Sequence, residues 1–175
     1  MNARPSYRNS VQGDLAALES LYPEAFPDED LVPLVRDLLH DSPNVLSLVA
    51  AVDSQIAGHV VFTHCGVSES DASAALLGPL AVAPAWQRQG IGSALVHTGL
   101  QRMEEARVDV VCVLGDPNYY GRLGFVPESS IEPPYPLPPE WGDAWQSLRT
   151  AASTTPISGR LLAPQQWMNP SLWAP

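Results

Sequence analysis

The stretch from Leu76 to Gly92, LLGPLAVAPAWQRQGIG, constrains the fold more than any other part of this 175-residue chain. It opens as an apolar run that suits a strand buried on both faces. Pro84 ends this strand, because proline has no N–H to donate. Apolar residues then recur at helical spacing at Ile91, Leu95, Val96 and Leu100. The stretch therefore predicts a central strand, a tight turn and a helix.

A turn of this kind, with glycines at a helix N-terminus, can bind an anion. The first N–H groups of a helix lack partners within it, and the helix dipole favours negative charge there. Gly90 and Gly92 would let the backbone approach a phosphate closely, and Arg88 could add donors. The spacing fits neither the dinucleotide fingerprint nor the P-loop. The alternative is that the two glycines serve packing alone.

A second motif, GDPNYYGRLGF over Gly115–Phe125, follows a predicted buried strand over Val108–Leu114. Asp116 suits a helix N-cap, and Pro117 suits the first helical position. Gly124 is placed to end the short helix in the manner of a C-terminal glycine. We therefore predict a strand, a short helix and a return of the chain to the core.

The two motifs together resemble the GNAT superfamily of N-acetyltransferases. The motif Q-x-x-G-x-G after V-x-P resembles its coenzyme A pyrophosphate loop, and Y-x-x-x-G-F resembles a second signature about 30 residues later. The sequence GDPNYYGRLGF is similar to the corresponding segment in a bacterial branch of predicted N-acetyltransferases. The resemblance covers roughly Tyr7 to Val126.

The resemblance implies an α/β (α+β) fold. Its central sheet would be mixed and mostly antiparallel, with two parallel central strands that splay apart, and helices would flank it. We expect one domain over residues 1–175, with a core at about 7–126 and a Pro/Trp-rich C-terminal extension at about 127–175.

The activity implied is direct transfer of an acetyl group from acetyl-CoA, as co-substrate, to a primary amine of a small molecule or peptide, without a metal. A non-catalytic acyl-CoA-binding sensor or regulatory module on the same fold is the alternative, because a fold does not fix a function. A weaker third hypothesis is an interaction domain that uses the tryptophan-rich tail.

The resemblance also assigns site residues. Tyr120 matches the tyrosine that protonates the coenzyme A sulfur, and backbone amides near Val82 would polarise the thioester carbonyl. The implied cofactor-binding residues are Leu80, Ala81, Val82, Gln87, Arg88, Gln89, Gly90, Ile91, Gly92, Ser93, Asn118 and Tyr120. The general base stays open among Glu24, Glu69, His64, Asp116 and a water chain, and Asp116 is better explained as a cap.

The rest of the chain gives coarser expectations. The predicted elements are a strand over 7–9, helices from Leu15 to Pro23 and from about Asp30 to His40, strands over 45–52 and 56–65, a loop over 68–74, a helix from Ile91 to about Arg107 and a last strand over 157–162. We expect residues after Val126 to form an ordered loop over the substrate mouth. Four tryptophans, Trp141, Trp145, Trp167 and Trp173, either line an acceptor pocket or anchor this segment, and we favour anchoring.

Charge and composition limit the classes of molecule that this chain is expected to bind. The formal net charge is −10, and all nine basic residues are arginine. Such an acidic chain argues against nucleic acid and anionic membranes as partners and permits a cationic amine. Cys65 and Cys112 lie in apolar runs and are expected to be buried free thiols. His59 or His64 could be a general base, but we favour a packed or surface residue for each. No leader-like or membrane-spanning run is visible, so we expect a cytoplasmic protein. The acidic charge and the apolar residues of the tail are compatible with a monomer or a homodimer.

Overall fold

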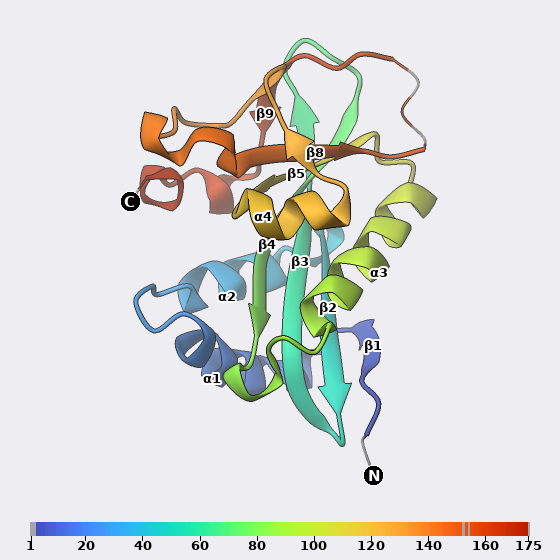
Figure 1. Cartoon of the computed structure of the whole chain (residues 1–175), viewed down its shortest axis with the longest axis vertical. Helices are drawn as coiled ribbons and strands as arrows, with labels where there is room; N and C mark the ends of the chain where they lie inside the picture. The colour runs from blue at the N-terminus through green and yellow to red at the C-terminus, as the bar shows by residue number, and fades with distance from the viewer. Residues whose placement is uncertain (1–2, 152, 154, 175) are drawn as a thin grey trace. The chain divides into compact units, whose positions relative to one another are not determined.

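The computed structural model describes residues 3–151, 153 and 155–174 (Figure 1). It contains both strands and helices, as the sequence predicts. The elements are β1 (Ser6–Asn9), α1 (Leu15–Ala25), α2 (Val32–His40), β2 (Val45–Val52), β3 (Gln55–Val67), β4 (Ser73–Val82), α3 (Ile91–Glu105), β5 (Val110–Leu114), α4 (Pro117–Tyr120), β6 (Val126–Pro127), β7 (Ile131–Glu132), β8 (Trp145–Arg149) and β9 (Gly159–Leu162).

The strands form a mixed sheet in the order β1-β2-β3-β4-β5-β8-β6, and β9 pairs with β3 and β7. Strands β1 and β2, β5 and β8, β6 and β8, and β3 and β9 pair antiparallel, whereas β4 and β5 are parallel. The expected fold, a mixed and mostly antiparallel sheet with helices, is confirmed.

The parallel ladder between β4 and β5 ends before β4 does. It runs from Ala74 opposite Val110 to Leu77 opposite Val113, whereas β4 continues to Val82. Pro79 lies just beyond the last pair and has no N–H to contribute to a ladder. The ladder therefore covers all but the last residue of β5, whereas β4 extends five residues beyond its last pair.

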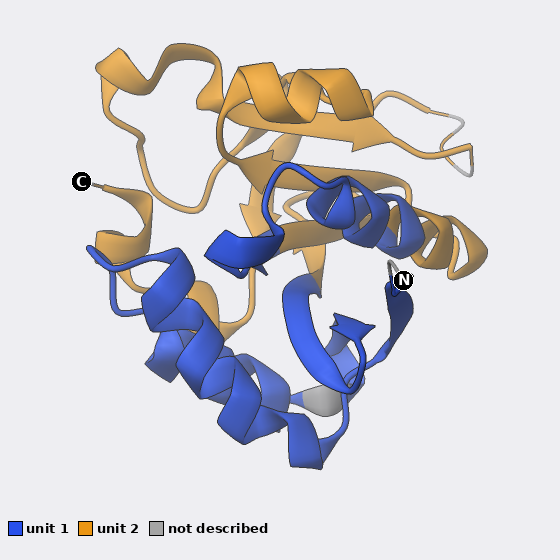
Figure 2. Cartoon of the chain, turned by 60° about the horizontal axis from the view of Figure 1, so that its bottom comes forward, with its two compact units in different colours: residues 1–62, 78–99 blue, residues 63–77, 100–175 orange. Residues whose placement is uncertain are grey.

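The chain forms two compact units (Figure 2). One comprises residues 1–62 and 78–99, and the other residues 63–77 and 100–175. The first holds α1, α2, the start of α3 and the last part of β4. The second holds β5, α4 and the C-terminal segment.

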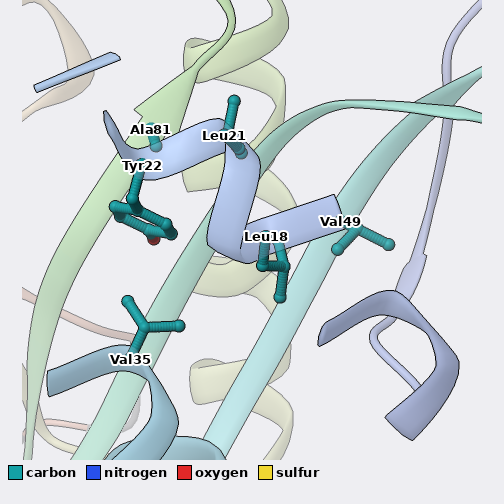
Figure 3. Close-up of a cluster of buried hydrophobic side chains, with 6 residues drawn as sticks. All are labelled: Leu18, Leu21, Tyr22, Val35, Val49 and Ala81. Carbon is teal, nitrogen blue, oxygen red and sulfur yellow. The ribbon is translucent and has the colours of Figure 1, made fainter. Parts of the chain in front are cut away.

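In the first unit, α1 and α2 bury apolar side chains in one cluster with residues of β2 and β4 (Figure 3). Its buried members are Leu18, Leu21, Tyr22, Val35, Val49 and Ala81. The prediction that α1 ends at Pro23 is wrong, because the helix continues to Ala25. Pro23 lies in the last turn, where its missing N–H costs a single hydrogen bond, and the N–H of Phe26 still donates to the carbonyl of Tyr22 at 2.8 Å.

Most other boundaries fall close to the predicted ones. They differ as follows: α2 and β5 begin at Val32 and Val110, β3 extends to Val67, β4 begins at Ser73, α3 ends at Glu105 and β9 begins at Gly159. Both cysteines are free, but only Cys112 is fully buried and Cys65 is half-buried. Burial raises the pKa of the Cys65 thiol to about 12.

The segment after Val126 is not only a loop, which corrects the sequence-based expectation. Residues 145–149 form β8, which pairs with β5 along its whole length. Trp145, Trp167 and Trp173 are buried and in ring contact, with centroids 5.8 Å apart for Trp145 and Trp173 and 6.2 Å for Trp167 and Trp173. Their ring N–H groups donate to Ile131, Thr63 and Trp167, respectively. These three tryptophans anchor the segment, whereas Trp141 is half-exposed.

Helix α3 packs against β3 within the first unit because two glycines permit it. A Cβ at Gly58 would lie 3.0 Å from Leu95 and 3.1 Å from Ile91 of the helix. A Cβ at Gly99 would lie 2.0 Å from the ring of Phe62 on β3, a distance that real Cβ atoms do not reach. The helix and the strand therefore touch where each lacks a side chain.

His59 lies in the core of the first unit in a hydrogen-bonded chain. Its Nδ1 is 2.7 Å from the hydroxyl of Tyr22, and its Nε2 is 2.7 Å from that of Ser47, which also accepts from Ser10 at 2.6 Å. Each ring nitrogen thus has one hydroxyl partner, and the tautomer of the neutral ring decides which nitrogen donates. Burial lowers the pKa of His59 to about 3, although the charge of Asp14 opposes the shift. His59 is thus a satisfied core residue.

We predict that Gly99→Ala destabilises the protein by about 1–3 kcal/mol, because the new methyl overpacks against Phe62. Helix propensity alone would give the opposite sign. Urea unfolding measures the change. Gly13→Ala is the control, because a Cβ there meets nothing within 4 Å. Equal stability of both variants would contradict the packing.

We predict that the free energy of unfolding falls on mild acidification because of His59. An unfolded histidine takes up a proton below its pKa of about 6.5, whereas folded His59 does so only near pH 3. Between pH 7.5 and 5 this group removes about 2 kcal/mol of stability. His59→Gln, which keeps a donor and an acceptor without a titratable ring, should lose less over this interval. The exposed His97→Gln is the control, and equal losses in His59→Gln and the wild type would refute the assignment.

Candidate functional site

The turn between β4 and α3 is held by its own side chains. After a short 3₁₀ helix over Pro84–Trp86, Arg88 and Gly90 have left-handed backbone, with φ of 62° and 82°. The side-chain amide of Gln87 donates to the carbonyl of Val82 at 3.0 Å. That of Gln89 donates to the carbonyl of Ala85 at 3.3 Å. The two glutamines thus tie the turn to the end of β4 and to itself.

The backbone N–H groups of this turn are arranged as in a site that binds an anion. Among the described residues, none accepts a hydrogen bond from the N–H groups of residues 88–93. The first helical bond at this end runs from the N–H of Ala94 to the carbonyl of Gly90, at 3.0 Å. The free donors therefore coincide with the positive end of the α3 dipole, in a turn whose left-handed residues favour an anion-binding concavity.

The residues predicted to bind the cofactor differ in exposure. Gln87, Arg88, Gln89 and Gly90 are exposed, and a Cβ at Gly90 would meet nothing within 4 Å. Gly92, Ser93, Leu80 and Val82 are half-buried. Ile91 and Ala81 bury their side chains in the core, so they could serve a ligand only through their backbone. All of these residues lie in the first compact unit.

In the second unit, α4 presents Tyr120. Asp116 caps the helix as predicted, because its carboxylate accepts from the N–H of Asn118 at 2.9 Å. Gly124 ends the following 3₁₀ turn with φ of 100°, also as predicted. Asn118 itself is exposed. The Tyr120 ring makes edge contacts with Tyr119 and Phe125, at centroid distances of 5.0 and 5.6 Å.

The Tyr120 hydroxyl is available to a ligand. The residue is only 9% exposed, and its hydroxyl makes no hydrogen bond with any described residue. No described buried side-chain oxygen or nitrogen lacks a partner, so this hydroxyl must reach solvent. Burial, with a smaller contribution from Tyr119, raises the pKa of Tyr120, so the phenol keeps its proton at neutral pH. It can therefore act as a proton donor.

The structure distinguishes some of the candidate general bases by their hydrogen bonds and exposure. Asp116 is committed to its cap. Glu24 and Glu69 are exposed, and His64 is half-buried on β3. Within the described residues, no three of the His, Cys, Asp and Glu side chains are grouped so as to hold a metal ion. None of the described helices is long and apolar enough to cross a bilayer.

The sequence interpretation missed one feature next to this site. Gly78-Pro79 lies inside the stretch that we predicted as a continuous buried strand, and the parallel ladder ends there. Both residue types are known to interrupt strands, so the signal was present in the sequence.

Comparison with known proteins agrees with this geometry. The family model for the acetyltransferase (GNAT) family matches residues 15–125. The chain is 31% identical over 157 residues to the uncharacterized N-acetyltransferase YjhQ of Escherichia coli K12, which covers 86% of this chain and 87% of that protein. It is 34% identical over 119 residues to the uncharacterized N-acetyltransferase YhbS of the same strain, which covers 67% and 71%.

Solved structures show the same fold. The crystal structure of YhbS from E. coli in complex with CoA matches with a TM-score of 0.85 and 28% identity, over 97% of this chain and 94% of that one. A GNAT acetyltransferase from Brucella melitensis in complex with acetyl-CoA matches with a TM-score of 0.77 and 24% identity, over 95% and 99%. With the match over residues 15–125 and relatives above 30% identity, this chain belongs to the GNAT family of acetyltransferases.

Proposed function

We propose that this protein is an acetyl-CoA-dependent N-acetyltransferase that moves an acetyl group directly from the thioester to a primary amine of a small molecule or peptide. The observation that carries the proposal is the turn over residues 88–93, whose N–H groups have no acceptor in the described chain. The co-substrate would supply the missing acceptors through its pyrophosphate. The relatives crystallised with CoA or acetyl-CoA support this choice of ligand.

Backbone N–H groups and charged side chains would bind different parts of the co-substrate. The N–H groups from Gly90 to Ser93 would hold the pyrophosphate at the helix N-terminus, and Arg88 would add a guanidinium from outside the turn. Gln87 and Gln89 would act by holding the turn in shape, since their amides already bond to Val82 and Ala85. Backbone from Leu80 to Val82 would contact the thioester, and Asn118 the pantetheine arm.

The transfer follows from ordinary thioester chemistry. The amine nitrogen attacks the carbonyl carbon, the new C–N bond forms, and the C–S bond breaks. A backbone amide near Val82 would polarise the carbonyl oxygen. The ammonium proton leaves to a base or water, and Tyr120 gives its proton to the departing thiolate. Because the Tyr120 hydroxyl reaches solvent, water can restore that proton. The thioester is an activated donor, so the proposed step requires no metal.

The acidic chain favours a cationic acceptor. With a net charge of −10, it would attract an amine that is protonated in solution, and it would repel nucleic acid and anionic lipid. We assign the acetyltransferase to one domain over residues 1–175, acting as a monomer or homodimer. The proposal places it in the cytoplasm, where acetyl-CoA is an ordinary metabolite.

We predict that calorimetry shows acetyl-CoA binding to the wild type and none to Gly90→Trp. The indole would occupy the space that is open beside Gly90 and that the pyrophosphate would fill. Gly142→Trp is a matched control, because Gly142 also has positive φ, 49°, and open space. Failure of the wild type to bind would overturn the cofactor assignment. Binding to Gly90→Trp as tight as to the wild type would move the site elsewhere.

We predict that Tyr120→Phe lowers kcat by about 100-fold or more, because general acid catalysis contributes at this level. Release of coenzyme A with a panel of amines measures turnover, and the affinity for acetyl-CoA should fall far less than kcat. Tyr119→Phe is the control. Unchanged turnover in Tyr120→Phe would remove this residue from the chemistry. Tight binding by the wild type without turnover of any amine would favour the sensor alternative.

A further inference from the structure

The ring of Tyr120 rests on the backbone of Gly115. A Cβ at Gly115 would lie 2.5 Å from Cε2 of the ring, 3.0 Å from Cδ2 and 3.6 Å from Cζ. Gly115 is therefore a flat support on which the ring lies in direct contact. Any side chain at this position would displace the ring, because an aromatic side chain can turn more easily than a fixed backbone can move.

The backbone of Gly115 is fixed from both sides by the C-terminal segment. Its N–H donates to the carbonyl of Ala144 at 3.0 Å. Its carbonyl accepts from the side-chain amide of Gln146 at 3.1 Å. Gln146 is only 1% exposed, and its amide also donates to the carbonyl of Ala144 at 3.4 Å. One buried side chain thus holds both Gly115 and the strand that reaches it.

This support matters because packing alone orients Tyr120. Its hydroxyl forms no hydrogen bond with the described residues, so no polar contact of the chain fixes where the proton points. The ring is positioned by Gly115 below it and by its edge contacts with Tyr119 and Phe125. A shift of Gly115 would move the hydroxyl directly, and misplacement by about 1 Å can cost about 100-fold in rate.

We propose that Gly115 and Gln146 are positioning residues for the reaction, and that the C-terminal segment takes part in catalysis by fixing the support of Tyr120. Gln146 lies outside residues 15–125, the part of the chain that the family model matches. The inference rests on the proposed function, in which Tyr120 donates the proton.

The first experiment compares two buried polar residues that are neighbours on β8. Gln146→Leu removes the bond to Gly115 at similar side-chain volume. Ser147→Ala removes a comparable bond, from the Ser147 hydroxyl to Glu128 at 2.6 Å, without touching Gly115. We expect Gln146→Leu to lower kcat about 10- to 100-fold with the KM for acetyl-CoA within about twofold, and Ser147→Ala to keep kcat. Equal kcat in the two variants would overturn the inference.

The second experiment repeats Gln146→Leu in a Tyr120→Phe background. If Gln146 acts through the phenol, its removal has no further effect on kcat there, so the two losses are not additive. A full additional loss would show that Gln146 acts by another route. Wild-type turnover of Tyr120→Phe itself would instead refute the proposed role of Tyr120, so the two failures are distinguishable.

A third measurement needs no acceptor amine. In protein labelled with 3-fluorotyrosine, the ¹⁹F resonance of Tyr120 is assigned by its loss in Tyr120→Phe. Gly115→Ala and Gln146→Leu should both shift this resonance. Gly121→Ala, where a Cβ meets nothing within 4 Å, and Ser147→Ala should leave it in place. Melting curves identify any variant that does not fold. An unshifted Tyr120 resonance in folded Gly115→Ala would overturn the positioning role, even if no amine were turned over.

Discussion

Close packing of α3 on β3 is the interaction on which the proposed cofactor-binding turn depends. The turn before α3 has no apolar anchor of its own between Gln87 and Gly90, all of which are exposed. Ile91 is both the first residue of the helix and a core residue, 2% exposed, and it packs over Gly58. The N–H groups at the start of the helix are therefore fixed by a contact one residue away. A looser helix would leave the same donors without a defined direction.

The parallel ladder between β4 and β5 lies along the chain between this turn and Tyr120, the proposed proton donor. Beyond Leu77, β4 runs through Pro79 to Val82 and into the turn. Beyond Val113, β5 ends at Leu114, and the next residue is the glycine that supports Tyr120. Each partner strand thus leads, within a few residues of the ladder, to residues that the proposed function uses. Pro79 lies just beyond the ladder on one strand and a capped helix follows the other, so a short sequence signal lies at each end of the pairing.

Local chemistry explains what the sequence predicted well. The Asp116 cap, the Gly124 helix end and the turn at Gly90 each depend on residues within one or two positions, so short motifs were sufficient. The extension of α1 past Pro23 was missed because a proline in the last turn removes only one bond. Strand β8 was missed for a different reason. Its five residues carry no clear alternation, and their pairing with β5 joins positions far apart in sequence, which no local pattern encodes.

The C-terminal segment shows how an irregular stretch can hold one residue accurately. Successive side chains on a strand point to opposite faces, so Trp145 and Gln146 face different neighbours on β8. The Trp145 ring donates to the carbonyl of Ile131 at 2.7 Å and packs on Trp173, which fixes the strand from one side. Gln146 then reaches Gly115 from the other side. Trp145, Trp167 and Trp173 act as anchors, and the strand that Trp145 anchors also carries Gln146, which contacts the support of Tyr120. Composition alone could not reveal this, because it depends on which residue of β8 faces Gly115.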